Sequence, residues 1–577
     1  MRSRPHRRAA VRAAAHAAVI LVVGLGLAGC ASIPTSGPVQ QGAEVRSERD
    51  DPFIRVIARP PRPGLTATEV VQGFLAASAS FDDDHSVARA YLAPESRAGW
   101  DPLVGTVVYQ DGGATVREAA TGRVVFSAAR TATVSARGEY LAASGTEQTA
   151  FRLRQVQGEW RIVDPPTGLL LTRLDVDRAY RTFDLFFPDP SRTVLVPNQV
   201  LLPVGPGVST TLVRALLEGP TPWLAPAVRT AFPAGTALAV DSAPLQDGVV
   251  LVDLTEPAAQ AVGSEAAALS AQLVWTLRQL SDVSGVAITV EGVPLAVPGA
   301  GQVQPRGAWP QVDPDVVGPS ASTFLVSGGA LVAARDGDLV PVPGAAGTGG
   351  TQLTAPAVSV AEDRMAALDG TGTRLLVGPL TADGVLRQVL TGTALTAPTW
   401  DVLDTVWTAD RRADGSVAVW SVQAAAAPRQ AAVDDLPAGR VVALVVARDG
   451  ARAAVVVERG GGRVLLLGRV ERDDGTVRLA GFRQVAAVLT DVRDVAWGSA
   501  DTLVVLGRSG SGVLQPVVVD VSGLAVRQLG TVAAEITSVA AAPGLPTLAA
   551  TVDGRVWQST GVGWSELAPG RDPTYPG

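Results

Sequence analysis

The chain has little of the chemistry on which most active sites depend. Its 577 residues contain no lysine, one cysteine at position 30, and histidines only at positions 6, 16 and 85. A structural zinc site takes four cysteine or histidine ligands close together, so this composition argues against one. A single thiol cannot form a disulfide within the chain. A histidine-activated nucleophile beyond the N-terminal region would have to use His85. The sequence therefore predicts no metal, no cofactor and no catalytic residue.

The N-terminus has the layout of a secretory signal peptide. Arginines at positions 2, 4, 7, 8 and 12 precede an apolar run over residues 17–28 that ends in small residues. A membrane-spanning helix around Cys30 is the alternative, but the run is well short of the ~20 residues needed to cross a bilayer. The ending Leu27-Ala28-Gly29-Cys30 resembles the bacterial lipobox. That resemblance implies cleavage between Gly29 and Cys30, and lipid on Cys30. We therefore expect residues 1–29 to be a signal peptide and the mature protein to be lipid-anchored on the extracytoplasmic face of the cell membrane.

The mature chain would be acidic. Without the five arginines of residues 1–29, 43 basic residues face 55 acidic ones, giving a formal charge of −12. No basic patch stands out, which argues against a nucleic-acid partner. The absence of disulfides in a secreted chain of this length means that large hydrophobic cores must stabilise it. Its length favours several domains.

Proline and glycine divide the chain. Residues 30–65 are rich in proline and lack apolar periodicity, so we interpret them as a lipidated tether. Residues 66–178 predict an α+β domain that begins with a capping box at Thr66–Glu69 and continues into five strands. Helices followed by a long antiparallel sheet resemble the nuclear-transport-factor-like fold. His85, after three aspartates, is expected at a solvated helix start, and the domain is expected to serve packing or docking.

Residues 180–298 predict a second α+β domain. Helices are expected near residues 210–218 and 265–280, and strands at 249–254 and 286–290. Leu216–Pro220, Pro233–Thr236 and Val250–Leu254 together resemble the GerMN domain of sporulation and germination proteins. The matching positions are turns and core residues, so the resemblance implies a fold and no catalysis. Asp253 and Glu256 could form an acid–base pair, but a turn and a helix cap explain them better.

Residues 299–321 form a glycine- and proline-rich linker, and residues 322–577 predict an all-β propeller. Segments that resemble the inner strand of a blade recur at steps of 42, 43, 52 and 43 residues, near Val358, Trp400, Ala443, Val495 and Ser538. This period is typical of a four-stranded propeller blade. Residues 323–343 predict a further, incomplete blade, so the count is five or six. The expected fold is therefore multidomain, with two α+β domains followed by a propeller.

Catalytic groups are scarce in the predicted propeller. Its one tyrosine is Tyr575, which argues against a sialidase-type site. Aspartates that precede glycine predict loop turns rather than calcium or glycosidase carboxylates; they lie at positions 336, 369, 383, 414, 449, 474 and 553. Tryptophans could line a sugar-binding face, but they are expected to wedge between blades; they lie at positions 400, 407, 420, 497, 557 and 564.

Taken in order, the lipobox, tether, helix-and-sheet domain, GerMN-like domain and propeller resemble the actinobacterial LpqB lipoprotein family. The segments Cys30–Pro34 and Val552–Trp557 also resemble it. The resemblance implies that the protein binds and modulates the extracellular domain of an MtrB-type sensor histidine kinase, in the two-component system with the regulator MtrA, and so affects cell-wall and division control. The residues themselves predict an anchored binding protein that is not an enzyme. The alternative is a propeller that binds or cleaves cell-wall glycans, and a pair of carboxylates at the propeller mouth would favour it.

Overall fold

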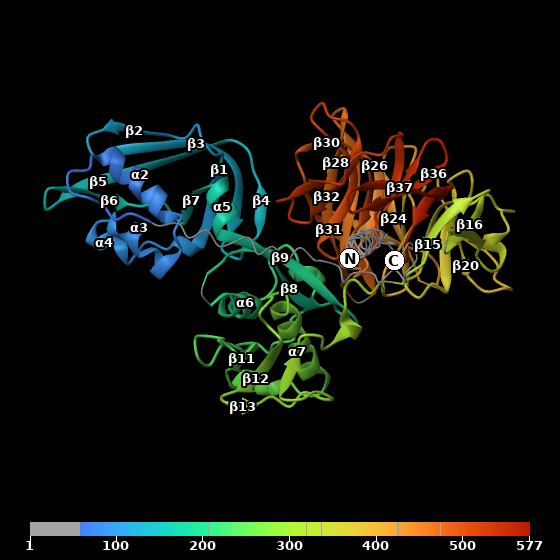
Figure 1. The fold of residues 1–577 in the computed structure, drawn as a ribbon, viewed down its shortest axis with the longest axis horizontal. Helices are drawn as coiled ribbons and strands as arrows, with labels where there is room; N and C mark the ends of the chain where they lie inside the picture. Colours follow the sequence, from blue (N-terminus) through green and yellow to red (C-terminus); the bar gives the residue numbers. More distant parts are fainter. Residues whose placement is uncertain (1–57, 206, 319, 336, 424–425, 474) are drawn as a thin grey trace, which may run out of the picture. The chain divides into compact units, whose positions relative to one another are not determined.

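A computed structural model describes residues 58–577, except positions 206, 319, 336, 424, 425 and 474. In chain order, these residues form an α+β domain, a second α+β domain and an all-β propeller (Figure 1). The predicted fold class is therefore confirmed. Leu27, Ala28, Gly29 and Cys30, on which the lipid anchor depends, lie outside the described residues.

The first domain packs a helix against a seven-stranded sheet. The sheet runs in the order β6-β5-β3-β1-β7, with β2 and β4 also paired to β3. Strand β1 is antiparallel to β3 and parallel to β7. The helices are α2 (Ala67–Ser78), α3 (Ser86–Ala90), α4 (Pro94–Arg97) and α5 (Arg173–Ala179). The strands are β1 (Gly105–Tyr109), β2 (Thr115–Ala120), β3 (Arg123–Ser135), β4 (Tyr140–Ala142), β5 (Thr146–Val156), β6 (Glu159–Asp164) and β7 (Leu169–Thr172).

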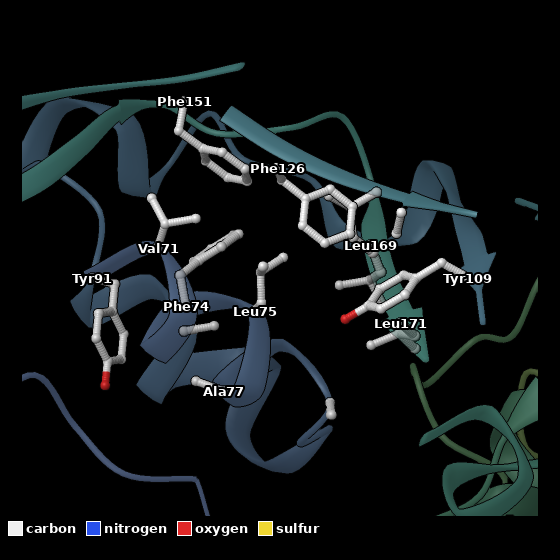
Figure 2. Close-up of a cluster of buried hydrophobic side chains, with 14 of the residues drawn as sticks. Val71, Phe74, Leu75, Ala77, Tyr91, Tyr109, Phe126, Phe151, Leu169 and Leu171 are labelled. Carbon is white, nitrogen blue, oxygen red and sulfur yellow. The ribbon is translucent and has the colours of Figure 1, made fainter. Parts of the chain in front are cut away.

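Helix α2 begins at the predicted capping box. The Thr66 side chain accepts a hydrogen bond from the Glu69 amide, and the Glu69 carboxylate accepts one from the Thr66 amide. Apolar residues at helical spacing then turn one face of α2 toward the sheet, where Phe74 is fully buried (Figure 2). Its ring makes edge contacts with Trp100 and Phe151, at centroid distances of 5.2 and 6.1 Å. Burying a side chain of this size stabilises the fold by roughly 2–3 kcal/mol, so Phe74 contributes substantially to this core.

His85 lies at a helix start, directly before α3, as the sequence predicted, but it is buried rather than solvated. It is 4% exposed, and its ring packs edge-on against Phe81 and Trp100. The imidazole hydrogen-bonds to the backbone of Ser78 and Ser80, where α2 ends, while its Nδ1 has no partner. The aspartates before it suggested solvent, but the last turn of a helix leaves carbonyl groups that need donors. Burial is the largest influence on His85 and lowers its pKa.

The second domain combines a long hairpin with a small mixed sheet. Strands β8 (Tyr180–Pro188) and β9 (Leu195–Pro203) pair along their whole length. Helix α7 (Ser264–Leu277) connects the parallel strands β11 (Val249–Leu254) and β12 (Gly285–Val290), a β-α-β unit. The remaining elements are α6 (Val208–Leu217), β10 (Leu245–Gln246), β13 (Val293–Pro294) and β14 (Val303–Pro305). The helices and strands expected here are present, each within three residues of its predicted bounds.

The propeller has six blades of four strands. The five blades continuous in sequence begin with inner strands β18 (Thr354–Val358), β22 (Thr399–Trp400), β26 (Arg440–Val446), β30 (Leu489–Trp497) and β34 (Ile536–Ala540). Their other strands are β19 (Arg364–Leu368), β20 (Arg374–Pro379), β21 (Arg387–Thr391), β23 (Thr405–Arg411), β24 (Val417–Gln423), β25 (Arg429–Val433), β27 (Arg452–Arg459), β28 (Gly462–Asp473), β29 (Thr476–Gln484), β31 (Thr502–Ser509), β32 (Gln515–Asp520), β33 (Val526–Gln528), β35 (Leu548–Thr551), β36 (Arg555–Thr560) and β37 (Gly563–Pro569).

The sixth blade joins the two ends of the propeller sequence. Strands β15 (Thr323–Ser327), β16 (Ala330–Arg335) and β17 (Asp338–Pro341) are its outer three. Its inner strand is β38 (Arg571–Thr574), from the end of the chain, which pairs antiparallel with β15. Contacts between inner strands run from β18 through β22, β26, β30, β34 and β38 and return to β18. The incomplete blade predicted at residues 323–343 is thus completed by the C-terminal strand.

Apolar side chains hold neighbouring blades together. Six buried clusters occupy the six interfaces between consecutive blades. Adjacent residues of one strand serve opposite interfaces: Phe324 packs toward the blade of β18, and Leu325 packs toward the blade of β34. This division follows from the two-residue period of a strand, which turns successive side chains to opposite faces of the sheet. Each blade therefore needs apolar residues on both faces.

Removing β38 should open the ring. A chain truncated after Gly570 loses the inner strand of one blade and exposes the edge of β15. We expect the melting temperature to fall by at least about 10 °C, because each kcal/mol lost from a domain of this size is worth about 2–4 °C. Scanning calorimetry would measure this, with Val562→Ser, at a fully exposed position, as the control. An unchanged melting temperature in the truncated chain would contradict closure by β38.

His85 should make stability depend on pH. In the unfolded chain its pKa is about 6.5, whereas in the folded state burial holds the pKa lower. As the pH falls below about 6.5, the unfolded chain binds the proton first, and the free energy of unfolding decreases. Thermal melts at pH 7.5 and 5.5 should therefore show a smaller loss for His85→Phe than for the wild type. Equal losses in the two proteins would show that this histidine does not contribute.

Candidate functional site

Asp253 and Glu256 do not form an acid–base pair in the second domain. The Asp253 carboxylate accepts hydrogen bonds from the Thr289 hydroxyl, at 2.6 Å, and from the Gly292 amide, at 2.9 Å. It therefore stabilises the turn between β12 and β13. Glu256 is the first residue of a short 3₁₀ helix, Glu256–Gln260. The turn interpretation of Asp253 is confirmed, whereas Glu256 lies in the first turn of its helix and the cap position is Thr255, which makes no side-chain capping hydrogen bond.

The aspartates that precede glycine in the described part of the propeller are turn residues. Asp369 is 1% exposed, and its carboxylate accepts hydrogen bonds from Thr371, Thr373 and Arg374 in its own loop. Burial alone would raise the pKa of Asp369, but these hydrogen bonds outweigh it and lower the pKa. Asp449 is equally buried and forms an ion pair with Arg452. These carboxylates are bound within their loops and face no open site.

Three tryptophans connect neighbouring blades, as expected. The indole N–H of Trp400 donates to the Ala357 carbonyl of the preceding blade, at 3.3 Å. Trp497 and Trp564 donate in the same way to the Val445 and Leu529 carbonyls, each in the preceding blade, at 3.0 and 3.1 Å. Trp400 and Trp407 are fully buried. These side chains are structural, and none of the three donors is available to a sugar.

The propeller axis contains a cavity of about 250 Å³. The walls come from all six inner strands, β18, β22, β26, β30, β34 and β38, and from residues next to them. Alanine, valine and proline make up much of the lining. The polar lining side chains are Thr399, Arg448, Arg493, Asp494, Trp497, Thr537, Ser538, Asp572, Thr574 and Tyr575. Because ligand sites are typically apolar cavities with a few polar groups, this is the candidate functional site of the propeller.

Arg448 bounds the cavity just beyond the end of β26. It is 6% exposed, and its three guanidinium nitrogens donate to the carbonyls of Trp497, Ala541 and Pro576, at 3.1–3.2 Å. These carbonyls belong to three inner strands or to the residues that follow them. Burial lowers the pKa of Arg448 to about 10, so the side chain remains a cation at neutral pH. Arg448 thus joins four blades at the axis.

Two carboxylates reach the same cavity from different blades. Asp494 lies on β30 and accepts a hydrogen bond from the Val539 amide on β34, at 2.8 Å. Asp572 lies on β38 and accepts one from the Ala355 amide on β18, at 3.2 Å. Sequence analysis missed both. Neither residue precedes a glycine, and only ring closure brings β38 to the axis.

A second site missed by sequence analysis joins the three domains. The Trp223 indole of the second domain donates to the Gly481 carbonyl of the propeller, at 2.7 Å, and the Arg483 guanidinium lies 4.1 Å from the Trp223 ring centroid. Arg483 also forms an ion pair with Glu139 of the first domain, at 2.7 Å. Gly481 has a φ of +64°, and an added Cβ would clash with the Arg469 guanidinium and lie 3.2 Å from the indole nitrogen, so this position favours glycine. We call Glu139, Trp223, Gly481 and Arg483 the domain junction.

Within residues 58–577 and their stated gaps, no three or more histidine, cysteine, aspartate or glutamate side chains are grouped so that they could hold a metal ion. No helix in that part of the chain is both long and apolar enough to span a bilayer.

Comparison with known proteins identifies three family regions. Residues 60–177 match the model "Lipoprotein LpqB, N-terminal domain", residues 184–296 match "Sporulation and spore germination", and residues 329–576 match "Lipoprotein LpqB beta-propeller domain". Among solved structures, the chain resembles TolB from Acinetobacter baumannii, with 14% identity, a TM-score of 0.34, and 44% of this chain and 65% of that chain covered. It also resembles the first GerMN domain of Bacillus subtilis GerM, with 18% identity, a TM-score of 0.19, and 22% and 98% covered.

Relatives align with the chain over nearly its whole length. Lipoprotein LpqB of Thermobifida fusca is 34% identical, with 96% of this chain and 97% of the relative covered. Lipoprotein LpqB of Streptomyces coelicolor is 32% identical, with 100% and 99% covered. The N-terminal domain, the sporulation-type domain and the β-propeller match their family models in that order along the chain, the two relatives align with at least 96% of it at 32–34% identity, and the protein belongs to the LpqB lipoprotein family.

Proposed function

We propose that the protein is a lipoprotein anchored through Cys30 to the extracytoplasmic face of the membrane, where it binds an MtrB-type sensor histidine kinase and modulates its signal to MtrA. The end-to-end match to LpqB lipoproteins carries the proposal, because the family resemblance implies this accessory role. The lipobox Leu27–Cys30 supports the anchor. Residues 30–65 would serve as the tether between the lipid and the folded domains.

The proposed mode of action is binding without catalysis. The aspartates and tryptophans described above are engaged in turns and blade contacts, which supports a structural role for them. A protein that performs no chemistry can change a kinase only by binding one of its conformations more tightly than another. In such coupling between sites, the binding free energies for the two conformations typically differ by roughly 1–3 kcal/mol.

The domain junction supports transmission through the folded part of the chain. Glu139, Trp223 and Arg483 come from the three domains and share one cluster of contacts. A second contact reinforces it, because the Gln199 side-chain amide exchanges two hydrogen bonds with Asp520 and Ser522, at 3.1 and 2.9 Å. A kinase bound to one domain would therefore act on the others through this cluster.

One observation favours the glycan-cleaving alternative. Asp494 and Asp572 line one cavity, and burial raises the pKa of Asp494 to about 6, as in the acid of a glycosidase pair. However, each carboxylate also binds the backbone of the neighbouring inner strand. Release of reducing sugars from purified cell wall, abolished by Asp494→Asn, would establish this activity. No release by the wild-type protein would dismiss it.

The ion pair of the domain junction should couple the first domain to the propeller. The side chains of Glu139 and Arg483 are 14% and 22% exposed, so solvent screens their pairing only in part. In a double-mutant cycle with Glu139→Gln and Arg483→Gln, we expect an interaction energy of about 1 kcal/mol or more in calorimetric stability.

The control pair is Arg152 and Asp164, which lie in one domain with side chains 69% and 55% exposed, and should give an interaction energy near zero. Equal interaction energies for the two pairs would contradict a coupled junction.

The anchored protein should change the output of the kinase. Membrane vesicles that contain the kinase and the full-length protein should phosphorylate the response regulator to a different extent from vesicles without the protein. Cys30→Ala should weaken the effect at equal protein concentration, because the lipid raises the local concentration at the membrane. Restoration of the effect by excess unanchored protein is the expected control. Equal phosphorylation in all conditions, with no binding to the isolated sensor domain, would contradict the proposal.

A further inference from the structure

Two carboxylates of the axial cavity have no ion-pair partner among the described residues. Asp494 and Asp572 both line the cavity, and neither forms an ion pair with an arginine of the described residues. Buried charges in proteins are normally paired. Asp494 and Asp572 are half-buried, and two carboxylates that share a cavity without a direct ion pair mark a position where a cation would be stabilised.

Each carboxylate retains capacity for a ligand. The Oδ2 atom of Asp494 accepts the Val539 amide, and the Oδ2 atom of Asp572 accepts the Ala355 amide. A carboxylate has two oxygens and about four lone-pair sites, so these bonds leave acceptors free. Burial raises the pKa of Asp494 to about 6, hydrogen bonds from the Val539 and Val495 amides partly offset that rise, and the charge of Asp572 adds to it. A bound cation would offset the Asp572 charge and so lower the pKa of Asp494 again.

The two arginines of the lining are engaged elsewhere. Arg493 donates through Nε to Asp491 on its own strand, at 3.0 Å. Arg448 directs its nitrogens to three backbone carbonyls, and the carboxylate that acts on its charge is Asp315, which is not part of the lining. Neither guanidinium therefore substitutes for a cation at Asp494 and Asp572.

The shape and lining of the cavity select the kind of cation. A volume of about 250 Å³ is far larger than a bare metal ion needs. Ala355, Pro356, Val442 and Ala443 contribute apolar wall, which suits a hydrocarbon stem that carries its charge at the tip. Ser538 adds a hydroxyl whose buried oxygen has no hydrogen-bond partner in the described structure. Such a hydroxyl can accept an N–H from the same ligand.

We propose that the axial cavity of the propeller binds an alkyl-guanidinium or alkyl-ammonium group, held by Asp494 and Asp572. The group is the end of an arginine or lysine side chain on a bound polypeptide, or a free amine of the same chemistry. The charged tip binds the two carboxylates and the Ser538 hydroxyl, and the stem lies against the apolar wall. This inference does not depend on the kinase proposal, because it rests on the cavity alone.

Isothermal titration of the full-length protein in detergent tests the proposal with defined probes. N-acetyl-arginine amide should bind with a dissociation constant on the order of 1 mM or tighter, as expected for a small ligand. N-acetyl-citrulline amide has nearly the same shape without the charge and should bind at least about tenfold more weakly. A Gly-Gly-Arg-Gly-Gly peptide distinguishes the sources. Tighter binding of the peptide indicates a polypeptide side chain, and binding of the acetyl-amide alone indicates a free amine.

Variants separate charge from structure. Asp494→Asn keeps a side-chain oxygen for the Val539 amide but removes the charge, so it should weaken arginine binding about tenfold or more while the melting temperature stays near that of the wild type. Asp553→Asn, a charge change at an exposed loop outside the cavity, should leave binding unchanged. Three results would overturn the proposal: no binding of either arginine probe, equal binding of the citrulline probe, or wild-type affinity in Asp494→Asn.

Discussion

The propeller depends on how its inner strands satisfy the backbone groups that face the axis. Each inner strand pairs with one strand of its own blade, so its other edge has no ladder partner within the blade. An unpaired buried amide or carbonyl costs roughly 1–3 kcal/mol. Side chains of the neighbouring blade supply partners in this chain: the Ala355 amide binds Asp572, the Val446 amide binds Thr399, and the Val539 amide binds Asp494.

Carbonyl groups at the axis are satisfied in the same way. The Ala357 and Val445 carbonyls accept from tryptophans of the following blades, and the Tyr575 hydroxyl binds the Pro546 carbonyl of the blade before it. The Arg448 guanidinium donates hydrogen bonds to three more carbonyls, which lie in separate parts of the ring. These contacts connect five of the six consecutive pairs of inner strands, and at the sixth Tyr575, just after β38, contacts the loop between β34 and β35. Blade packing and axial hydrogen bonds therefore reinforce each other, and the cavity is the space that this arrangement leaves.

Local patterns in the sequence predicted what local physics determines. The capping box at Thr66, the aspartate turns and the blade period all depend on residues close together in the chain, and the structure confirms them. The sixth blade was only partly predictable. Strand β38 has four residues, one of them a proline, and it becomes a strand because β15 presents an edge to it. His85 was assigned to solvent because a polar run precedes it, whereas the end of α2 and an aromatic cluster determine its burial.

The axial carboxylates and the domain junction gave no sequence signal for the same reason. Asp494 and Asp572 meet through ring closure, and Glu139 meets Arg483 through contacts between domains. Such sites are defined by tertiary structure, so composition and spacing cannot reveal them. The axial carboxylates offer a charged cavity for a ligand, and the domain junction offers contacts that can couple the three domains. Both the axial carboxylates and the domain junction lie in a member of the LpqB lipoprotein family.

Hydrogen–deuterium exchange with residue-level resolution tests the central claim most directly. If side chains of neighbouring blades satisfy the axial edge of the inner strands, the amides of Ala355, Val446 and Val539 should exchange as slowly as amides inside the blade ladders. In Asp494→Ala, the Val539 amide should exchange much faster, while Val446, which binds Thr399, should keep its protection. Rapid exchange of all three amides in the wild-type protein, at the rate of exposed loops, would contradict the account.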